Sequence, residues 1–341
     1  NLLLVVVDVR HVFGAVAAGL AAAVELSRRG LASTIVERAP DLGGRSLELA
    51  CKGSPACVRC DACYPYDLRR EASRSDRVRI MLGAEVEEVS WTPSGAAVRV
   101  CTPEGRTMLE AGALILATGC TPFDPGADPR LHSQECPDVL SSLDVERALA
   151  TCNRLMVPST GRPPQEMAIV QCVGSRDVKR GVPYCSKACC KYAYKLGLRL
   201  RHLHPDLKLT FFFMDWRPLE DSGKALEAWS AADSSVHLVR SRPAEVIPGG
   251  RPTLRYAAPG ESIEEESFDI VMLSVGMVPC SANSRLAELF GIELDALGYL
   301  RSDRQGVIIA GTSGGPKDLR ESVEEGTAAA GMAARLLEAE D

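Results

Sequence analysis

The first forty residues constrain the fold most, because two strand patterns there flank a helix pattern made of small residues. An apolar run that ends near Phe13 precedes GAVAAGLAAAVELSRRG, which predicts a helix closed by Gly30, and the strand pattern STIVER follows. This order is typical of a dinucleotide-binding βαβ unit. Gly14 and Gly19 hold the first and third glycine positions of G-x-G-x-x-G, but Val16 replaces the middle one, which predicts a shifted or weakened phosphate loop.

Glu37 ends the second predicted strand, 18 residues after Gly19. A carboxylate at this place can bind the ribose hydroxyls of an adenosine, and the alternative is a surface glutamate at a strand end. The DLGGR turn follows at residues 41–45. Its Gly44 and Arg45 are predicted to lie along a flavin diphosphate.

Later segments extend this first unit. RVRIMLGAEVEEV, AAVRV and ALILATG predict three strands, and GVIIAGTSGGPKDLRESVEEG predicts a strand, a glycine turn and the start of a long helix. Similar segments occur in flavoproteins with two dinucleotide-binding domains, where free N–H groups at the helix N-terminus stabilise a reduced flavin. We therefore predict FAD, with further contacts from Val86, Ala117, Thr118, Gly119, Gly311, Thr312, Lys317, Ser322 and Val323.

Four cysteines mark a second unit. MAIV and LTFFFMD predict its first two strands, yet the loop at residues 171–175 contains one glycine and a cysteine where a nicotinamide-binding loop would be rich in glycine. The cysteines form a C-x12-C-x3-C-C array of Cys172, Cys185, Cys189 and Cys190. Such an array suits a 4Fe-4S cluster, because each iron needs one thiolate.

Two alternatives to the cluster stay open, a zinc site and unrelated buried thiols. Zinc sites usually come as two short-spaced pairs of ligands. The neighbouring Cys189 and Cys190 would have to point in different directions, which a large cluster tolerates better than a tetrahedral ion does. The array therefore favours the cluster.

The predicted fold class is α/β, with a dinucleotide-binding domain that a second Rossmann-like domain interrupts. We predict a discontinuous FAD-binding domain over residues 1–151 and 266–341. Residues 152–265 are predicted to form the second domain, with the cysteines in place of a nicotinamide loop.

Composition narrows the function classes. The chain of 341 residues is 46% apolar and carries a net charge of −6, which argues against nucleic acid as its main partner. Thirteen cysteines in a chain that is no small disulfide scaffold predict a reducing compartment, the cytoplasm. The apolar start is too short for a signal segment, and no stretch has the length of a membrane span.

At this point the sequence resembles the flavin core of the heterodisulfide reductase A-subunit family, over nearly the whole chain. The resemblance rests on QCVGSRDVKRGVPYCSKACCKYAYK, ATGCTPFDP, LSVGMVP and AGTSGGPKDLRESVEEG. It implies a thioredoxin-reductase-like fold with one FAD and a 4Fe-4S cluster on the four cysteines of the array. It also implies that Lys195 lies near the flavin N5 edge, where a cation favours the reduced flavin. The alternative for Lys195 is a solvent-facing helix lysine.

The resemblance also implies partners. The chain is similar to the short forms in the heterodisulfide-reductase-like complex of sulfur-oxidising bacteria, and to the flavin subunits of quinone-interacting membrane oxidoreductases. We expect it to pass electrons through iron–sulfur subunits that resemble heterodisulfide reductase B and C. Because thioredoxin-reductase-like proteins dimerise, we also expect a homodimeric core.

A second cysteine group, Cys51, Cys57, Cys60 and Cys63, has C-x5-C-x2-C-x2-C spacing. Three interpretations stay open, namely a second cluster, a redox-active or disulfide pair beside the flavin, and structural thiols. The leading function is an electron-transfer subunit of a sulfur-metabolising complex, with sulfur oxidation as the expected direction. The alternatives are a free-standing thiol or persulfide reductase that uses this group and takes electrons from a nicotinamide, and a scaffold that has lost its flavin.

Overall fold

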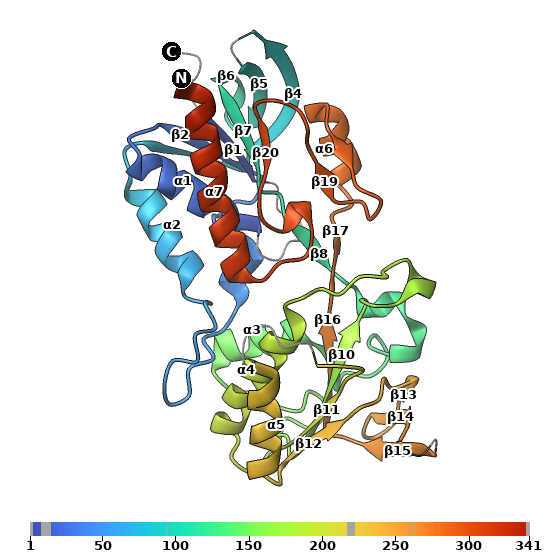
Figure 1. Ribbon diagram of the computed structural model, residues 1–341. Helices are drawn as coiled ribbons and strands as arrows, with labels where there is room; N and C mark the ends of the chain where they lie inside the picture. Colours follow the sequence, from blue (N-terminus) through green and yellow to red (C-terminus); the bar gives the residue numbers. More distant parts are fainter. Residues whose placement is uncertain are drawn as a thin grey trace. The chain divides into compact units, whose positions relative to one another are not determined.

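A computed structural model describes residues 3–7, 15–93, 95–216, 222–258, 260 and 262–338. It divides the chain into two units, each built on a five-stranded parallel sheet (Figure 1). The first unit comprises Asn1–Leu47, Asp61–Pro122 and Val278–Asp341, and the second comprises Glu48–Cys60 and Phe123–Met277.

The parallel sheet of the first unit has the strand order β20-β7-β1-β2-β3. The order of elements is that of a Rossmann fold, in which β1, α1 and β2 form the opening βαβ unit. Its elements are β1 (Leu3–Val7), α1 (Ala15–Arg28), β2 (Ser33–Glu37), α2 (Tyr64–Arg74), β3 (Val78–Leu82), β4 (Glu85–Thr92), β5 (Gly95–Thr102), β6 (Gly105–Ala111), β7 (Ala113–Leu116), β8 (Cys120–Pro122), α6 (Asn283–Phe290), β18 (Glu293–Leu294), β19 (Leu300–Arg301), β20 (Val307–Ile309) and α7 (Leu319–Glu338).

The small residues of α1 allow α7 to approach it closely. A β-carbon added to Gly326 of α7 would lie 2.1 Å from the carbonyl oxygen of Ala18 in α1. Gly30 has a φ of +81° just after α1, the left-handed conformation in which helices commonly end. The predicted helix and its glycine stop are therefore confirmed.

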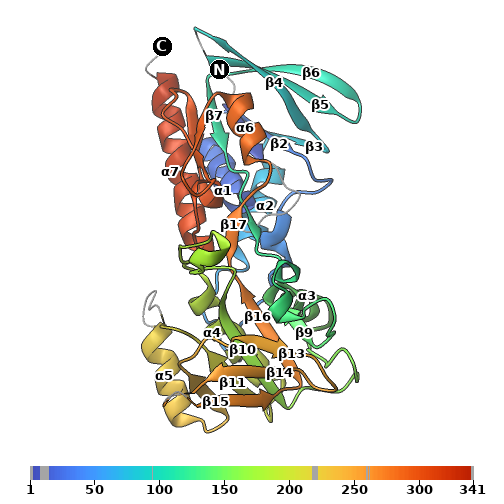
Figure 2. The same ribbon diagram turned by 90° about the vertical axis from the view of Figure 1, so that its right-hand side faces the viewer.

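Both faces of the first sheet are covered. Ala113 and Ile115 of β7 pack in the apolar cluster of α1, α2 and α7, whereas Leu114 and Leu116 pack in the cluster of α6 and the antiparallel sheet β4-β5-β6. This alternation follows from the two-residue period of a strand. Figure 2 shows β4, β5 and β6 as a separate layer of the first unit.

The parallel sheet of the second unit has the order β12-β11-β10-β16-β9. One of its faces packs against α3, α4 and α5, and the other packs against the antiparallel sheet β13-β14-β15. Its elements are β9 (Val139–Ser141), α3 (Ser142–Cys152), β10 (Glu166–Val173), α4 (Cys189–Leu203), β11 (Lys208–Phe212), α5 (Ser222–Ala232), β12 (Val236–Val239), β13 (Glu245–Ile247), β14 (Thr253–Ala257), β15 (Ile263–Ser267) and β16 (Ile270–Val275). A last strand, β17 (Met277–Pro279), follows where the chain leaves this unit.

The two-Rossmann architecture matches the predicted fold class, but the divisions between the units differ from the predicted ones. The predicted boundaries at 151/152 and 265/266 lie inside elements that belong to the second unit. The first boundary falls in the last turn of α3, after β9, and the second falls in β15, before β16. Yet β9 and β16 pair with each other in the sheet of β10. Pairing between strands about a hundred residues apart in sequence leaves no local signal, so the chain pattern placed them in the wrong unit.

Candidate functional site

The carboxyl end of the first sheet gathers the residues predicted to bind FAD. Because β2, β7 and β20 are parallel, the residues that follow them meet at the same edge, where open α/β sheets bind their ligands. Glu37 ends β2, the segment 117–119 follows β7, and the segment 311–312 follows β20. The fold therefore brings three separate predicted segments to one place.

Two buried polar groups stand at this edge. Glu37 is fully buried, and its Oε1 accepts a hydrogen bond from the backbone N–H of Ala39 at 2.8 Å. Thr118 is also buried, and among the described residues its Oγ1 has no hydrogen-bond partner. Buried polar groups normally have partners, so this hydroxyl fits a site that takes a polar ligand. This is the observation that links the edge to a dinucleotide.

The glycine loop itself is only partly described. Gly14 lies outside the described residues, and so does the side chain of Val16, whereas Gly19 is buried within α1. Gly44 has a φ of +43° and begins a short 3-10 helix over Gly44–Glu48 that includes the half-buried Arg45. The effect of Val16 on the loop stays a prediction.

Val86 differs from the other predicted contacts. Its side chain lies in the apolar cluster that also contains Val36 and Met81. The structure therefore assigns the Val86 side chain to the core of the first unit.

The N-terminus of α7 carries carboxylates as well as free amides. Asp318 accepts from the backbone N–H of Glu321, and Glu321 accepts from that of Asp318, each at 2.8 Å. Ser322 Oγ donates to the carbonyl of Asp318 at 2.8 Å. This reciprocal cap satisfies amides that the sequence predicted to face a flavin, so it reduces the positive potential expected there.

Lys317 adds a cation beside this cap. Its Nζ donates to the carbonyl of Gly311 at 3.1 Å and lies 3.3 Å from Oε1 of Glu325. Glu325 in turn accepts from the backbone N–H of Gly311 at 2.8 Å. Thr312 is buried beside this contact, and Val323 packs in the core of the unit. The 311–312 turn is thus held to α7.

The carboxyl end of the second sheet gathers the four cysteines of the array. Cys172 lies at the end of β10, and Cys189 and Cys190 begin α4. Cys185 lies in the loop between β10 and α4. Cys185 is half-buried and the other three are buried. The ring of Phe123 occupies the space beside Gly174, where a β-carbon would come within 1.9 Å of it. The loop after β10 therefore carries thiols, and the ring of Phe123 packs against it, at the place where a nucleotide loop would lie.

Two buried thiols of the array have raised pKa values, and other cysteines of the array contribute to the increase. Burial raises the pKa of Cys172 to about 11, with a further increase from Cys190, while Arg176 opposes both. A hydrogen bond with Cys190 and burial raise the pKa of Cys189 well above its ordinary value, and Cys172 and Cys185 raise it further. The thiols of Cys172 and Cys189 therefore resist deprotonation in the protein as described, and a nearby positive charge would favour their thiolate forms.

The backbone around the array is strained in a way that functional sites often show. Cys172, Arg176 and Lys187 have φ values of +61°, +54° and +60°, which non-glycine residues seldom adopt. The backbone N–H of Lys187 points to Sγ of Cys185 at 3.3 Å. The guanidinium of Arg176 pairs with Asp215, which holds the cation beside Cys172.

The geometry does not suit a single ion. Among the described residues, no group of three or more His, Cys, Asp or Glu side chains is placed to hold one metal ion. A 4Fe-4S cube spreads its four thiolates over four irons, so its ligands stand further apart than those of tetrahedral zinc. The cluster on the four cysteines of the array stays a prediction.

Lys195 lies on α4, and its ammonium group contacts a backbone carbonyl. Its buried Nζ donates to the carbonyl of Arg59 at 2.5 Å, within the second unit. The alternative of a solvent-facing helix lysine is therefore wrong. Its predicted place beside a flavin stays a prediction.

The second cysteine group divides between the units. Cys51, Cys57 and Cys60 belong to the second unit, and Cys63 belongs to the first. All thirteen cysteines are free thiols. Backbone N–H groups two residues further along, at Gly53 and Arg59, point to the sulfurs of Cys51 and Cys57, each at 3.4 Å. These N–H···S contacts resemble the one at Cys185.

The 48–60 segment is fastened to α3 and α4 by charges that sequence patterns do not show. Lys52 pairs with Glu146 of α3, and both side chains are buried, at 3% and 0% exposure. Nζ of Lys52 lies 5.4 Å from the ring centroid of Tyr192 on α4, and Arg199 donates to the carbonyl of Gly53 at 2.8 Å. These contacts hold the segment that contains Cys51, Cys57 and Cys60 to α3 and to the helix that begins with Cys189.

Sequence reasoning also missed Gln171. It lies next to Cys172 in β10, is 2% exposed, and neither atom of its side-chain amide has a hydrogen-bond partner among the described residues. A signal was present, because Gln171 continues the Met167 and Ile169 positions of an otherwise apolar strand face.

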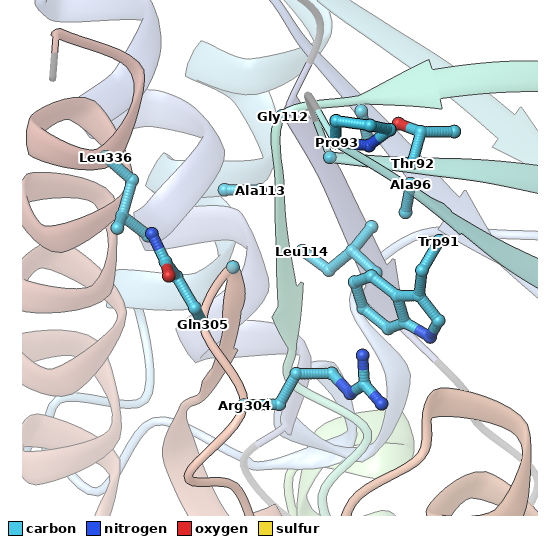
Figure 3. Close-up of a pocket in the computed structure, with 13 residues that line it drawn as sticks. Trp91, Thr92, Pro93, Ala96, Gly112, Ala113, Leu114, Arg304, Gln305 and Leu336 are labelled. Atoms are coloured by element: carbon cyan, nitrogen blue, oxygen red, sulfur yellow. The ribbon is translucent and has the colours of Figure 1, made fainter. Parts of the chain in front are cut away.

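A pocket of about 220 Å³ lies elsewhere in the first unit (Figure 3). Trp91, Leu114, Arg304 and Leu336 line it, and the Arg304 guanidinium carbon lies 4.3 Å from the Trp91 ring centroid. It opens at the amino end of β7, whereas the predicted FAD contacts lie at the carboxyl end. It is therefore not the predicted dinucleotide site.

Among the described helices, none is long and apolar enough to cross a membrane.

The comparisons with known proteins point in one direction. Residues 12–64 match the family model of an NAD(P)-binding Rossmann-like domain. The chain is 34% identical to the A subunit of the ferredoxin/F420H2-dependent CoB-CoM heterodisulfide reductase of Methanosarcina acetivorans, over 67% of this chain and 31% of that protein. It is 26% identical to the A subunit of the H2:CoB-CoM heterodisulfide,ferredoxin reductase of Methanothermobacter marburgensis, over 96% of this chain and 63% of that protein.

Solved structures agree on the fold. Thioredoxin reductase from T. acidophilum aligns with a TM-score of 0.61 and 16% identity, over 100% of this chain and 98% of that one. The Lactococcus lactis thioredoxin reductase aligns with a TM-score of 0.60 and 15% identity, over 99% and 100%. The predicted thioredoxin-reductase-like fold is confirmed. The chain spans about a third of the length of the curated relatives that it matches first.

Proposed function

Because the chain belongs to the heterodisulfide reductase A-subunit family of oxidoreductases, we propose that it is an FAD- and 4Fe-4S-binding electron-transfer component of a heterodisulfide-reductase-like complex. We place that complex in cytoplasmic sulfur metabolism, with sulfur oxidation as the preferred direction. The residues at the carboxyl edges of the two sheets support the choice of cofactors.

The observation that carries the proposal is the thiol array at the carboxyl end of the second sheet. Cys172 lies at the end of β10, Cys189 and Cys190 begin α4, three of the four thiols are buried, and Arg176 lies beside Cys172. In this proposal Cys172, Cys185, Cys189 and Cys190 hold the cluster. The backbone N–H of Lys187 and the N-terminus of α4 stabilise the negative charge of the sulfurs.

The first unit would hold FAD with the residues at its own carboxyl edge. Glu37 would accept hydrogen bonds from the ribose, and the Gly19, Gly44 and Arg45 segments would contact the diphosphate. Thr118 offers a buried hydroxyl without a partner among the described residues. The remaining contacts would come from Gly14, Ala117, Gly119, Gly311, Thr312, Lys317 and Ser322, and from the backbone of Val86 and Val323, whose side chains pack in the core.

The two groups together would join two-electron chemistry at the flavin to one-electron chemistry at the cluster. Lys195 would keep a cation near the reduced flavin, and its bond to Arg59 would fix its direction. Partner chains that resemble heterodisulfide reductase B and C would exchange electrons with this chain. The homodimeric core also stays part of the proposal.

Metal and flavin analysis of anaerobically purified protein tests the proposal. We expect one FAD and about four irons with four sulfides per chain, and a visible absorption that bleaches with dithionite. About eight irons would add a second cluster at the second cysteine group. Zinc in place of iron, or a chain without flavin after expression in a flavin-replete host, would overturn the proposal.

A thiol reductase is the second candidate function, and the N–H···S contacts of Cys51 and Cys57 favour it. A backbone N–H that points at sulfur stabilises the thiolate, which is the reactive form of cysteine. This candidate requires electrons from a nicotinamide. Oxidation of NADH or NADPH by the isolated chain, coupled to reduction of a disulfide or persulfide, would support it against the leading proposal.

A further inference from the structure

Gln171 is an amide side chain on an otherwise apolar strand face. Met167 and Ile169 of β10 pack with Ala193 and Leu196 of α4 in one apolar cluster. Because strand side chains alternate, Gln171 continues this face toward the carboxyl end of β10. Its place is therefore between the sheet and the beginning of α4.

The beginning of α4 is also where two cysteines of the array lie. Cys189 precedes Ala193 by one helical turn, so the two share the face of α4 that packs on the sheet. The chain direction reverses between β10 and α4, which brings the end of the strand under the start of the helix. Gln171 is thus adjacent in sequence to Cys172 and lies near the end of a strand that packs on the helix beginning with Cys189.

The strand pairing is irregular at this point. Val170 pairs with Leu273 and Val173 pairs with Val275, so Gln171 and Cys172 together oppose the single residue Ser274. Such a bulge turns side chains away from their regular alternation and is common beside active sites. The left-handed φ of Cys172 belongs to the same irregularity.

The bulge leaves three polar atoms without partners. Neither Nε2 nor Oε1 of Gln171, nor Oγ of Ser274, has a hydrogen-bond partner among the described residues. Both side chains are almost fully buried. Leaving a buried polar group unsatisfied is costly, so three of them at one bulge indicate that something else completes them.

We propose that the Nε2–H group of Gln171 donates a hydrogen bond to sulfur of the cluster bound by the array, and so raises the reduction potential of that cluster. This inference rests on the proposed function, because it needs the cluster. A donor stabilises the more negative, reduced form, and hydrogen bonds to the sulfurs are among the features that set cluster potentials.

The Gln171→Met variant tests the effect on the potential, because Met is similar in length and lacks the donor. We expect the variant to keep about four irons. At a fixed potential we expect about a tenfold lower ratio of reduced to oxidised cluster, which is about 59 mV for a one-electron couple. Thr210→Val is the matched control, because Thr210 is a buried polar residue on the opposite face of the same sheet. It should leave the potential unchanged.

A direct measurement covers the case in which Gln171→Met fails to fold or to bind iron. The chain contains four glutamines, at positions 134, 165, 171 and 305. Gln165 precedes Gln171 by six residues, at about 3.3 Å per residue of strand, so it is remote from the array. Wild-type protein labelled with 15N at glutamine side-chain amides should therefore show one 15N hyperfine coupling to the reduced cluster in pulsed EPR.

The outcomes separate this inference from the proposed function. A 15N coupling in the wild type, or a lower potential in Gln171→Met, supports the hydrogen bond. An iron-loaded wild-type protein without the coupling overturns the hydrogen bond and leaves the proposed function standing, with a buried water as the partner of the amide. Protein that takes up no iron overturns the proposed function itself.

Discussion

The two units share one architecture and differ in what they place at the carboxyl edge of the sheet. The first unit places glycines, a buried carboxylate and a buried hydroxyl there, which suit a dinucleotide. The second places four sulfurs, a strained bulge and an aromatic ring there. The comparison teaches that the Rossmann edge is a general place for a ligand, and that the residues on its loops decide which ligand it takes.

Loss of one cysteine of the array should give the largest difference in bound cofactor between the two sheet edges. In Cys189→Ser we expect most of the iron to be lost while the FAD content stays unchanged, because the two groups would bind to different sheets. Cys152→Ser, an exposed cysteine of the same unit, is the control. Iron and flavin analysis of the purified variants checks this, and loss of flavin along with iron would show that the two edges depend on each other.

The buried Lys52–Glu146 pair should give the largest stability effect in the second unit. Lys52→Met leaves the carboxylate buried without its cation, and breaking such a pair costs about 3–5 kcal/mol of unfolding free energy. Urea unfolding followed by tryptophan fluorescence measures this. A Trp91→Phe background leaves Trp216 and Trp229, which both lie in the second unit.

Two further variants identify the cause. Replacing both partners, in Lys52→Met with Glu146→Gln, should restore much of the loss, because no unpaired charge then stays buried. Arg28→Met, at the exposed Arg28–Glu71 pair of the first unit, should change the unfolding free energy by about 0–1 kcal/mol. A small effect of Lys52→Met alone would mean that the 48–60 segment is not held by this pair.

In the first unit, the close approach of α1 and α7 should be the sensitive contact. Gly326→Ala places a β-carbon against the Ala18 backbone, and such overpacking costs about 1–3 kcal/mol. Gly331→Ala on the same helix meets nothing nearer than 3.7 Å and should stabilise the unit by about 0.5–1 kcal/mol. Urea unfolding followed by the fluorescence of Trp91 alone measures the change in unfolding free energy of each variant. Changes of opposite sign support the close contact of α1 and α7, and changes of the same sign would contradict it.

The smallest expected effect is a pH dependence in the second unit. Burial lowers the pKa of His204, whose Nε2 accepts from the backbone N–H of Leu155 at 3.3 Å. The unfolded chain then binds a proton more readily than the folded one, so the contribution of His204 is present above about pH 6.5 and is lost as the pH falls below it. The unfolding free energy of the wild type should fall between about pH 7.5 and pH 5.5, and we expect this fall to be smaller in His204→Gln.

The exposed His202 provides the control for that measurement. His202→Gln should keep the pH dependence of the wild type. A flat wild-type profile would show that His204 protonates as easily in the folded as in the unfolded chain.

Local patterns predicted the fold well where the elements are local. The βαβ unit, the ATG strand end and the terminal helix all come from periodicity and from turn residues such as Gly30. The strand β6 was missed, because its RTML start has little apolar alternation. The unit boundaries were wrong because β9 and β16 join the second sheet through pairing with no local signal.

The candidate site was predictable in its cysteines and not in its support. The spacing of Cys172, Cys185, Cys189 and Cys190 predicts a common ligand, and the structure places them at the end of β10, in the loop after it and at the start of α4, while the ligand itself stays a prediction. The pair of Lys52 and Glu146 joins residues 94 positions apart, so no window of the sequence contains it. The role of Gln171 depends on a bulge that only the pairing with β16 reveals.

The attachment of the 48–60 segment to α4 has a consequence for the newly made chain. Cys51, Cys57 and Cys60 leave the ribosome well before Lys195 and Arg199, the helix residues that hold their segment. At a synthesis rate of about 5–20 residues per second, the delay is on the order of ten seconds. During that interval the segment with these three thiols lacks the hydrogen bonds from Lys195 and Arg199 that hold it in the finished fold.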